Sequence, residues 1–231
     1  MLNKSKLPIF VASIIASILP NSTFAKTEKS YLNLGFIHSR ANHKNIVNYQ
    51  INNNNLSMRQ ENSPKTFEDN GNGIALAYSY AFNYNNVFIA PGVFAELINT
   101  KSGKGRQPAV SLVNSYNYFN QFNVNSRQGL KLDIGYDLHN NFAIYGSTGL
   151  ARTSFSNYYQ TNLVLGTRIT NGKISSSENA IFYGGGLLFN VNDKVSVNTE
   201  LTTQSFKSND VFDHKIKTRL NVFKAGVSYR F

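Results

Sequence analysis

Cysteine and tryptophan are absent from this chain of 231 residues, and charged residues supply only 15% of it. Without cysteine the protein has no disulfide framework and no thiol chemistry. Hydrophobic residues reach only 41%. Beyond the first 25 residues there is no apolar run of about 18 residues, which a membrane-spanning helix requires. The composition therefore excludes a helical membrane protein, and a remaining length of about 205 residues suits a single domain.

Acidic residues are also scarce, with 12 Asp and Glu against 23 Lys and Arg and a formal net charge of +11. Such a balance can indicate a nucleic-acid partner. The start of the chain argues against one, because Lys4 and Lys6 precede an apolar core at residues 7–19 and small residues end at Ala25. This pattern predicts a signal peptide over residues 1–25, since the apolar core is too short for an anchor helix. We therefore expect a secreted domain, residues 26–231, with a charge of +9 and no nucleic-acid partner.

The end of the chain has two clearly different faces. Counting back from the terminus, one face of residues 215–231 carries Phe231, Tyr229, Val227, Ala225 and Phe223, and the other is polar or small. Successive strand side chains point to opposite faces, so the segment predicts a strand with one apolar wall. A soluble sheet can alternate in the same way, but its last residue seldom needs an apolar anchor. The closing strand of a transmembrane barrel needs one, because aromatic residues concentrate at the lipid interface.

Seven further segments alternate in the same way, most cleanly residues 74–82, where large apolar residues face one side and small residues the other. The other six are residues 31–38, 87–98, 127–138, 142–151, 181–191 and 195–205. Tight turns at residues 83–86, 139–141 and 192–193 alternate with long polar tracts at residues 39–72, 99–126, 152–179 and 207–214, which we interpret as loops. Within the third tract, Asn171 and Gly172 predict a hairpin that projects outward. Within the second tract, residues 116–124 still alternate, so we expect the following strand to extend above the membrane.

This order of strands, turns and tracts predicts an all-β fold. We expect an eight-stranded antiparallel up-and-down transmembrane β-barrel with short periplasmic turns and long outer loops. Eight strands enclose an interior that side chains fill, so a wide pore is not expected.

Two internal segments and the terminus carry a family resemblance. Residues 182–201, FYGGGLLFNVNDKVSVNTEL, resemble a glycine-rich strand, an Asn-Asp turn and a Glu-bearing strand of OmpA/OmpX-like, opacity-type small outer-membrane proteins. Residues 89–97, IAPGVFAEL, resemble another strand of that broad family. The C-terminal strand resembles the assembly signal of bacterial outer-membrane barrels, carried here by Phe223, Val227, Tyr229 and Phe231. The resemblance implies a surface-exposed barrel without enzymatic activity, inserted by the outer-membrane barrel assembly machinery.

The expected lumen contains charged side chains that should pair. Glu200 and Lys224 lie on adjacent strands, about equally far from the turn at residues 192–193 and from the chain end. Glu96 with Arg127 or Lys131 forms a looser second pair nearer the outer rim, and Asp133 and Tyr145 lie between the pairs. Because an unpaired charge in a narrow interior is costly, we expect pairing that also plugs the lumen. The alternative is that strand tilt shifts the levels and leaves each charge to lumen water.

The sequence contains few residues in patterns that would indicate a catalytic, metal or cofactor site. His38 with Ser39 is the only His and Ser pair at a suitable strand end, and neighbouring His and Ser are common by chance. No His, Asp or Glu cluster has metal-ligand spacing, and the glycine runs lack the strand-to-helix context of a phosphate-binding loop. We therefore predict no cofactor, no metal and no enzyme.

Two classes of function remain open. The first is a monomeric structural or adhesive surface barrel of the bacterial outer membrane, and the second is a narrow channel or small-ligand transport porin. A soluble lipid-binding barrel would require the apolar wall to face inward. Cations in the predicted outer loops suit lipopolysaccharide phosphates or an anionic host-surface ligand; they are Lys101, Lys104, Arg106, Arg168, Lys173, Lys207, Lys215 and Lys217. Outer-membrane lipid and lipopolysaccharide are thus expected partners.

Overall fold

The computed structural model describes residues 29–46, 66–102, 105–109, 116–139, 141–163, 169–209 and 215–231. The predicted signal peptide, residues 1–25, lies outside the described residues. Nine strands are described: β1 (Lys29–Ile46), β2 (Thr66–Tyr84), β3 (Val87–Ser102), β4 (Gly105–Ala109), β5 (Tyr116–His139), β6 (Phe142–Leu163), β7 (Ile169–Asn190), β8 (Val195–Asn209) and β9 (Lys215–Arg230). In the described part of the chain, no helix is long and apolar enough to cross a membrane.

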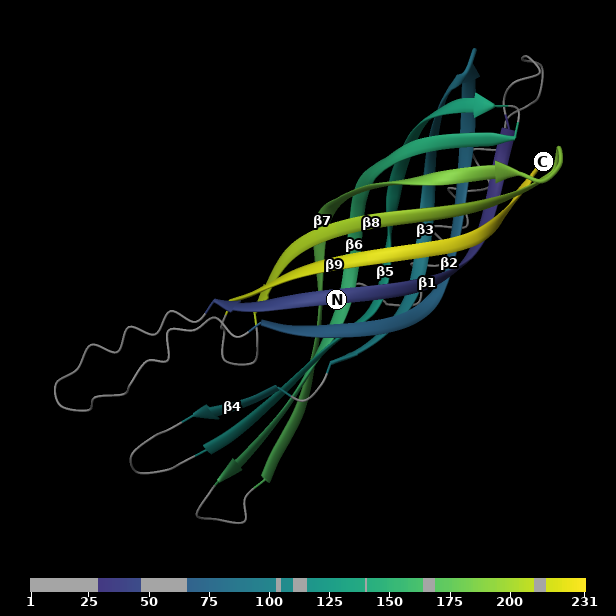
Figure 1. The fold of residues 1–231 in the computed structure, drawn as a ribbon. Coiled ribbons are helices and arrows are strands. Elements are labelled where there is room, and N and C mark those ends of the chain that lie inside the picture. Colours follow the sequence, from purple (N-terminus) through teal and green to yellow (C-terminus); the bar gives the residue numbers. More distant parts are fainter. Residues whose placement is uncertain are drawn as a thin grey trace, which may run out of the picture.

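Eight of these strands close into an antiparallel barrel (Figure 1). The order runs β3-β2-β1-β9-β8-β7-β6-β5, and pairing of β3 with β5 completes the ring. The ninth strand, β4, pairs with the far end of β5 outside the ring. The predicted eight-stranded fold is therefore confirmed. Closure removes the unpaired sheet edges that would otherwise expose backbone N–H and C=O groups.

The barrel wall has one apolar and one polar face over much of its length. Outward side chains include Leu34, Phe36 and Leu130, which are 63%, 77% and 62% exposed. The inward side chains of β2 are small, and Ala75, Ala77 and Ala81 are buried. The predicted faces of residues 74–82 are therefore correct. Tyr78 is buried although it belongs to the outward set, because its hydroxyl lies 3.1 Å from Ser30 Oγ and its ring contacts Phe231.

The predicted loop boundaries are wrong, because much of each of the first three long tracts is strand. β1 continues to Ile46 and β2 begins at Thr66, inside the tract at residues 39–72. The turn predicted at Asn171 and Gly172 does not exist, since both residues lie within β7 and pair with Gln160 and Tyr159 of β6. The connection between β6 and β7 falls at residues 164–168, outside the described residues. Hydrogen-bonded ladders continue here although exposed side chains such as Arg152 and Lys173 are now charged.

Strands β5, β6 and β7 project far beyond the ring. They contain 24, 22 and 22 residues, whereas a transmembrane strand needs only about 9–11. Together with β4 they form a four-stranded projection at the end opposite the short turns (Figure 1). A register shift between Val124 and Ser126 marks its base on β5. Such bulges bend a strand, which allows the projection to leave the curve of the barrel.

An apolar cluster crosses the interior at this level. Phe155 stacks between Phe122 and Phe206, with ring centroids 4.8 Å and 5.7 Å apart. Ile37, Ala41, Ala75, Ile98, Val124, Leu220 and Val222 complete the cluster, which we call the apolar plug. Its members come from seven of the eight ring strands. The plug therefore fills the interior between opposite walls.

We expect the closed ring to give heat-modifiable gel mobility. A barrel whose ring strands are all paired should stay folded in dodecyl sulfate at room temperature and unfold on boiling, because the ring has no free edge at which unfolding could start. Unheated and boiled samples should then migrate differently in electrophoresis. Identical migration of the two samples would contradict the closed barrel.

Candidate functional site: a charged network in the lumen

The centre of the site is a buried ion pair between neighbouring strands. Glu96 of β3 and Arg127 of β5 are direct Cα partners in the ladder. Arg127 Nε and Nη2 donate to the two carboxylate oxygens of Glu96 at 2.7 Å and 3.0 Å. Both side chains are fully buried. This bidentate geometry is the strong form of the Arg–carboxylate pair.

Lysine 224 joins that pair to a second acid. Its Nζ lies 3.1 Å from Glu96 Oε1 and also contacts Glu200. Glu200 of β8 and Lys224 of β9 are direct Cα partners, whereas Glu96 belongs to β3. Lys224 therefore bridges the lumen between non-adjacent strands.

The network ends on the side of the short turns. Lys131 Nζ lies 2.6 Å from Asp133 Oδ2 and 3.5 Å from Glu200 Oε2. The Tyr145 hydroxyl donates to Glu200 Oε2 at 3.4 Å. All seven predicted lumen residues thus belong to one connected network, whereas the sequence suggested two separate pairs.

The charges of this network balance. Three carboxylates, Glu96, Asp133 and Glu200, face three cations, Arg127, Lys131 and Lys224. A buried ion pair gains little over apolar residues, but losing one partner leaves an uncompensated charge in a low-dielectric interior. The arrangement can therefore hold the strands in one register, and each charge depends on the others.

Sequence reasoning missed the aromatic partners of the network. Arg127 Cζ lies 5.3 Å from the ring centre of Phe94 and 5.2 Å from that of Phe182. These distances suit cation–π attraction, which strengthens when the groups are desolvated. The glycine run at residues 184–186 could have indicated a different close contact, that with Tyr145. A Cβ at Gly186 would lie 2.5 Å from the Tyr145 hydroxyl oxygen, so this glycine provides the space for Tyr145.

The interior is not filled throughout, which corrects the expectation of a completely filled lumen. A cavity of about 260 Å³ lies on the turn side of the network, beside the small residues Ala75, Ala77 and Ala81 of β2. Lys131, Glu200 and Lys224 line it as well. Small inward side chains on β2 leave this space, while the network and the apolar plug fill the levels beyond it.

A second buried polar centre lies beyond the apolar plug. His43 Nδ1 is 2.9 Å from Thr218 Oγ1, and His43 Nε2 is 2.8 Å from Asp69 Oδ2. All three residues are buried, and Phe122 of the plug contacts the His43 ring at 4.5 Å. This centre ties β1, β2 and β9 together from inside. It was not predicted, because its residues fall in or beside tracts interpreted as loops.

The predicted pair of His38 and Ser39 is not a catalytic arrangement. His38 is exposed and its Nδ1 contacts Asn72, whereas Ser39 is buried and donates to the Gly71 carbonyl. Consecutive strand residues point to opposite faces, which keeps the two side chains apart. Among the described residues, no group of three His, Asp or Glu could hold a metal ion.

A family model for the outer membrane protein beta-barrel domain matches residues 11–231. The chain belongs to this family. No curated protein matches it. Similar solved structures include Ail, the attachment invasion locus protein of Yersinia pestis, at 16% identity and a TM-score of 0.47, covering 89% of this chain and 99% of Ail. The Escherichia coli outer membrane protease OmpT has 10% identity, a TM-score of 0.47 and coverage of 92% and 100%. OprG of Pseudomonas aeruginosa has 13% identity, a TM-score of 0.43 and coverage of 89% and 97%.

Membership of the family orients the barrel in the outer membrane. The short turns face the periplasm and the projection lies outside the cell, as is general for such barrels. The residues of the predicted assembly signal, Phe223, Val227, Tyr229 and Phe231, are all exposed on the outward face of β9 and the adjoining terminus. Tyr229 and Phe231 stack with ring centres 6.2 Å apart at the periplasmic end.

Removing one buried charge should destabilise this outer-membrane barrel strongly. We expect Glu96→Gln to cost about 3–5 kcal/mol, because the buried charge of Arg127 loses its carboxylate partner and Lys224 keeps only Glu200. The matched control is Glu68→Gln, which removes an acid from the half-exposed pair with Arg40 and should cost at most about 1 kcal/mol. The folded, heat-modifiable fraction at increasing urea in micelles measures both costs. Equal costs would show that the network does not stabilise the barrel.

The terminal aromatic should matter for insertion and not only for stability. We expect Phe231→Ala to lower the yield in the outer membrane several-fold, because an aromatic terminal anchor is lost at the lipid interface. Phe189→Ala is the matched control, since Phe189 is also exposed, near the periplasmic end of β7. Quantifying both variants in isolated outer membranes tests this role. Equal yields would argue against an assembly signal at the terminus.

Proposed function

We propose that this protein is a closed surface barrel with a structural or adhesive role, which does not conduct solutes. The observation that carries the proposal is the double obstruction of the lumen. The charged network joins β3, β5, β8 and β9 across the interior, and the apolar plug fills the next level outward. A solute would have to break balanced ion pairs and then displace stacked aromatic rings.

The projection supports a role outside the cell. Strands β4 to β7 hold a sheet beyond the membrane on a rigid base, and binding surfaces are commonly carried by segments that a rigid scaffold positions. An anionic host-surface ligand is the partner that we propose for this region. Lys173 is exposed on β7 with its Nζ 5.0 Å from the Tyr158 ring centre. The side chains of Lys101, Lys104, Arg106, Arg168 and Lys215 lie outside those described.

We further propose that the barrel is not an enzyme. His38 and Ser39 lie on opposite faces. The second polar centre, formed by His43, Asp69 and Thr218, is buried against the apolar plug, which leaves a substrate no route to it through the described interior.

A narrow channel is the second candidate, and the periplasmic cavity favours it. A space of about 260 Å³ already occupies part of the lumen. If the network rearranged, this space would extend outward as far as the apolar plug.

Conductance in planar bilayers separates the two candidates. We expect no conductance steps from the native barrel. The variant Phe122→Ala/Phe155→Ala/Leu220→Ala with Lys224→Ala should show conductance steps, because it removes buried side chains of the plug and the cation that joins the two acids of the network across the interior. Its matched control is Phe36→Ala/Phe223→Ala/Leu201→Ala, which alters the same apolar residue types on the outward face and should remain silent. Steps from the native barrel at levels similar to those of the plug variant would favour the channel.

A further inference from the structure

The cavity on the turn side of the network opens toward the periplasm. Lys29, Asp137 and Asn190 line it near the short turns and are only half-buried, which leaves a mouth on that side. At its other end the cavity reaches Glu200 and Lys224 of the charged network. The apolar plug fills the interior beyond the network. The route into this space of about 260 Å³ is therefore from the periplasm.

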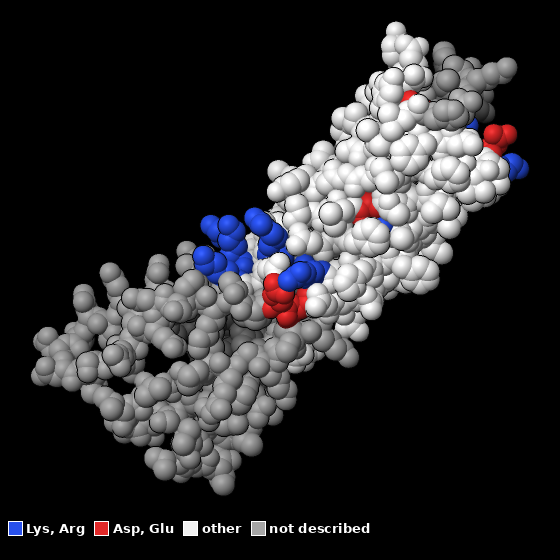
Figure 2. Space-filling view, viewed as in Figure 1, with Lys and Arg blue, Asp and Glu red and all other residues white. Residues whose placement is uncertain are grey.

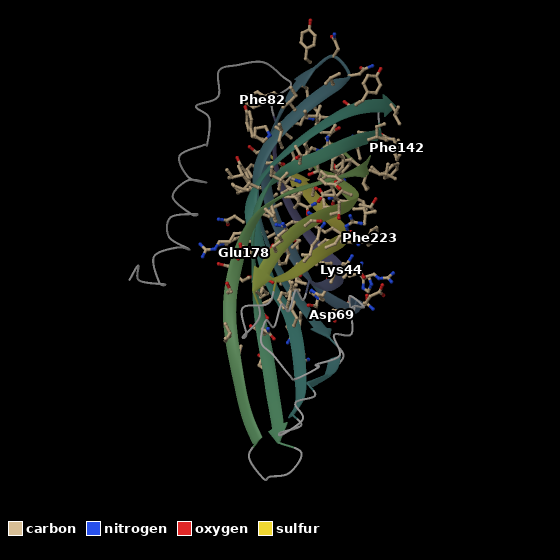
Figure 3. The ribbon with its side chains drawn as sticks, turned by 90° about the vertical axis from the view of Figure 1, so that its left-hand side faces the viewer. Lys44, Asp69, Phe82, Phe142, Glu178 and Phe223 are labelled. Atoms are coloured by element: carbon tan, nitrogen blue, oxygen red, sulfur yellow. The ribbon has the colours of Figure 1, made fainter. Side chains whose placement is uncertain are left out.

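The charged side chains at the depth of the cavity lie mainly inside the barrel. The visible outer wall carries few charged residues between its two ends (Figure 2). The second polar centre takes no part, because its Asp69 lies toward the outer end, away from Phe82 and Phe142 beside the periplasmic turns (Figure 3). The groups that can bind a molecule in the cavity are therefore those of its own lining.

Two buried side chains of that lining each keep one polar atom without a partner. Asp133 is 7% exposed and holds Lys131 with its Oδ2, whereas its Oδ1 has no hydrogen-bond partner among the described residues. Arg230 is 9% exposed and donates from Nη2 to the Asn192 carbonyl at 2.7 Å, whereas its Nε has no such partner in the described part of the chain. Because a buried polar group without a partner is costly, each atom indicates a place for a ligand group.

The two atoms have opposite hydrogen-bonding roles and lie at opposite ends of the cavity. A carboxylate oxygen only accepts, and a guanidinium N–H only donates. Asp133 belongs to the level of the network, because its partner Lys131 also contacts Glu200. Arg230 belongs to the level of the turns, because Asn192 lies between β7 and β8. A molecule that satisfies both atoms has a cationic donor at its inner end and an anionic acceptor at its outer end.

The wall between these two ends is largely apolar. The three buried alanines of β2 line it together with Ala90 and Phe94 of β3. Polar residues of the lining are partly occupied with one another, since Asn33 donates to Asn198 and Ser228. Ordered water needs two to four polar partners, which alanine and phenylalanine side chains do not supply. Small aliphatic groups suit this wall better.

The separation of the two ends sets the length of the molecule. Arg230 lies six residues from Lys224 along β9, which is about 15 Å along the membrane normal for a tilted strand. Each residue of an extended peptide spans about 3.5 Å, and a hydrogen bond at each end adds about 3 Å. Two or three residues therefore bridge the separation, whereas a single amino acid is too short.

We propose that the cavity binds a short peptide with free termini and small side chains, taken up from the periplasm. The ammonium group of the peptide donates to Asp133 Oδ1, and its carboxylate accepts from Arg230 Nε. Its side chains pack against the alanines of β2. Such a zwitterion leaves the charge balance of the network unchanged. The site needs no passage through the barrel, so it goes beyond the structural or adhesive role and does not depend on it.

Methyl NMR of the full barrel in nonionic micelles tests the site, with labelled alanine methyl groups and trialanine as the probe. We expect the signals of Ala75, Ala77 and Ala81 to shift during titration. The signals of Ala95, exposed on the outward face of β3, and of Ala41 in the apolar plug should stay unchanged. Free alanine should bind at least about tenfold more weakly, because it reaches only one end of the cavity. Unshifted β2 alanines, or binding of alanine as tight as that of trialanine, would overturn the proposal.

Blocked peptides and two variants assign the ends of the peptide. Trialanine amide and acetyl-trialanine should each bind the native barrel about tenfold more weakly than trialanine, because one charged hydrogen bond is lost. Arg230→Gln should bind the amide and the free peptide equally, and Asp133→Asn should do so for the acetylated and the free peptide. The matched controls, Lys194→Gln and Asp193→Asn in the exposed turn, should keep both preferences. Preferences that persist in the Arg230 and Asp133 variants contradict the assignment.

A steric variant keeps the test decisive if the loss of Asp133 prevents folding. Heat-modifiable mobility verifies folding of each variant. Ala77→Leu narrows the cavity without changing a charge and should abolish the methyl shifts at Ala75 and Ala81. Ala95→Leu adds the same volume on the outward face and should bind like the native barrel. Equal binding by these two variants would show that the peptide does not occupy the cavity.

Discussion

The need to neutralise every charge in a narrow interior governs this barrel. An isolated lysine or glutamate is costly in the narrow interior of eight strands, and each charge of the network is paired with another side chain although a cavity lies beside it. The balance of three acids and three bases satisfies that requirement only if β3, β5, β8 and β9 keep one relative register. A shift of one residue would turn Glu200 or Lys224 outward into lipid. The network therefore specifies register more than it adds net stability.

Contacts between ladder neighbours could be anticipated from the sequence, and contacts across the lumen could not. Glu200 and Lys224 were expected at one level because a tight turn and the chain end fix the register of β8 and β9. Glu96 and Arg127 are likewise direct partners. The contact of Lys224 with Glu96 depends on barrel shear and side-chain reach, which no local pattern encodes. The contacts of Phe94 and Phe182 with Arg127 could not be anticipated either. The alternation of their strands shows which face each ring lies on, but not which residue it contacts.

The tracts misread as loops have a common physical cause. In the membrane, apolar side chains face outward and polar side chains face inward. We located strands by this alternation, with the apolar residues at the outward positions. Beyond Phe223 and Val222 the phase reverses, because water surrounds the wall and the apolar plug fills the interior. Phe122, Phe155 and Phe206 then occupy inward positions that the membrane pattern assigns to polar residues. The alternation at residues 116–124 correctly indicated the extension of β5. A search for alternation of either phase would also have extended β6 and β8 and would have argued against a turn at Asn171 and Gly172.

The reversal at Phe223 and Val222 also explains why buried contacts and exposed cations occur at the same level of β9. Where β9 leaves lipid, apolar side chains on its inward face replace the burial that its outward side chains lose. On β9, Leu220 and Val222 supply that burial, while Arg219 and Lys217 point outward. Thr218 lies between those two cations and contacts His43, which is itself followed by Lys44. The plug and the second polar centre thus fix the backbone next to the exposed cations Lys44, Lys217 and Arg219. A flexible loop would carry the same charges but would not hold these cations in adjacent positions against their mutual repulsion.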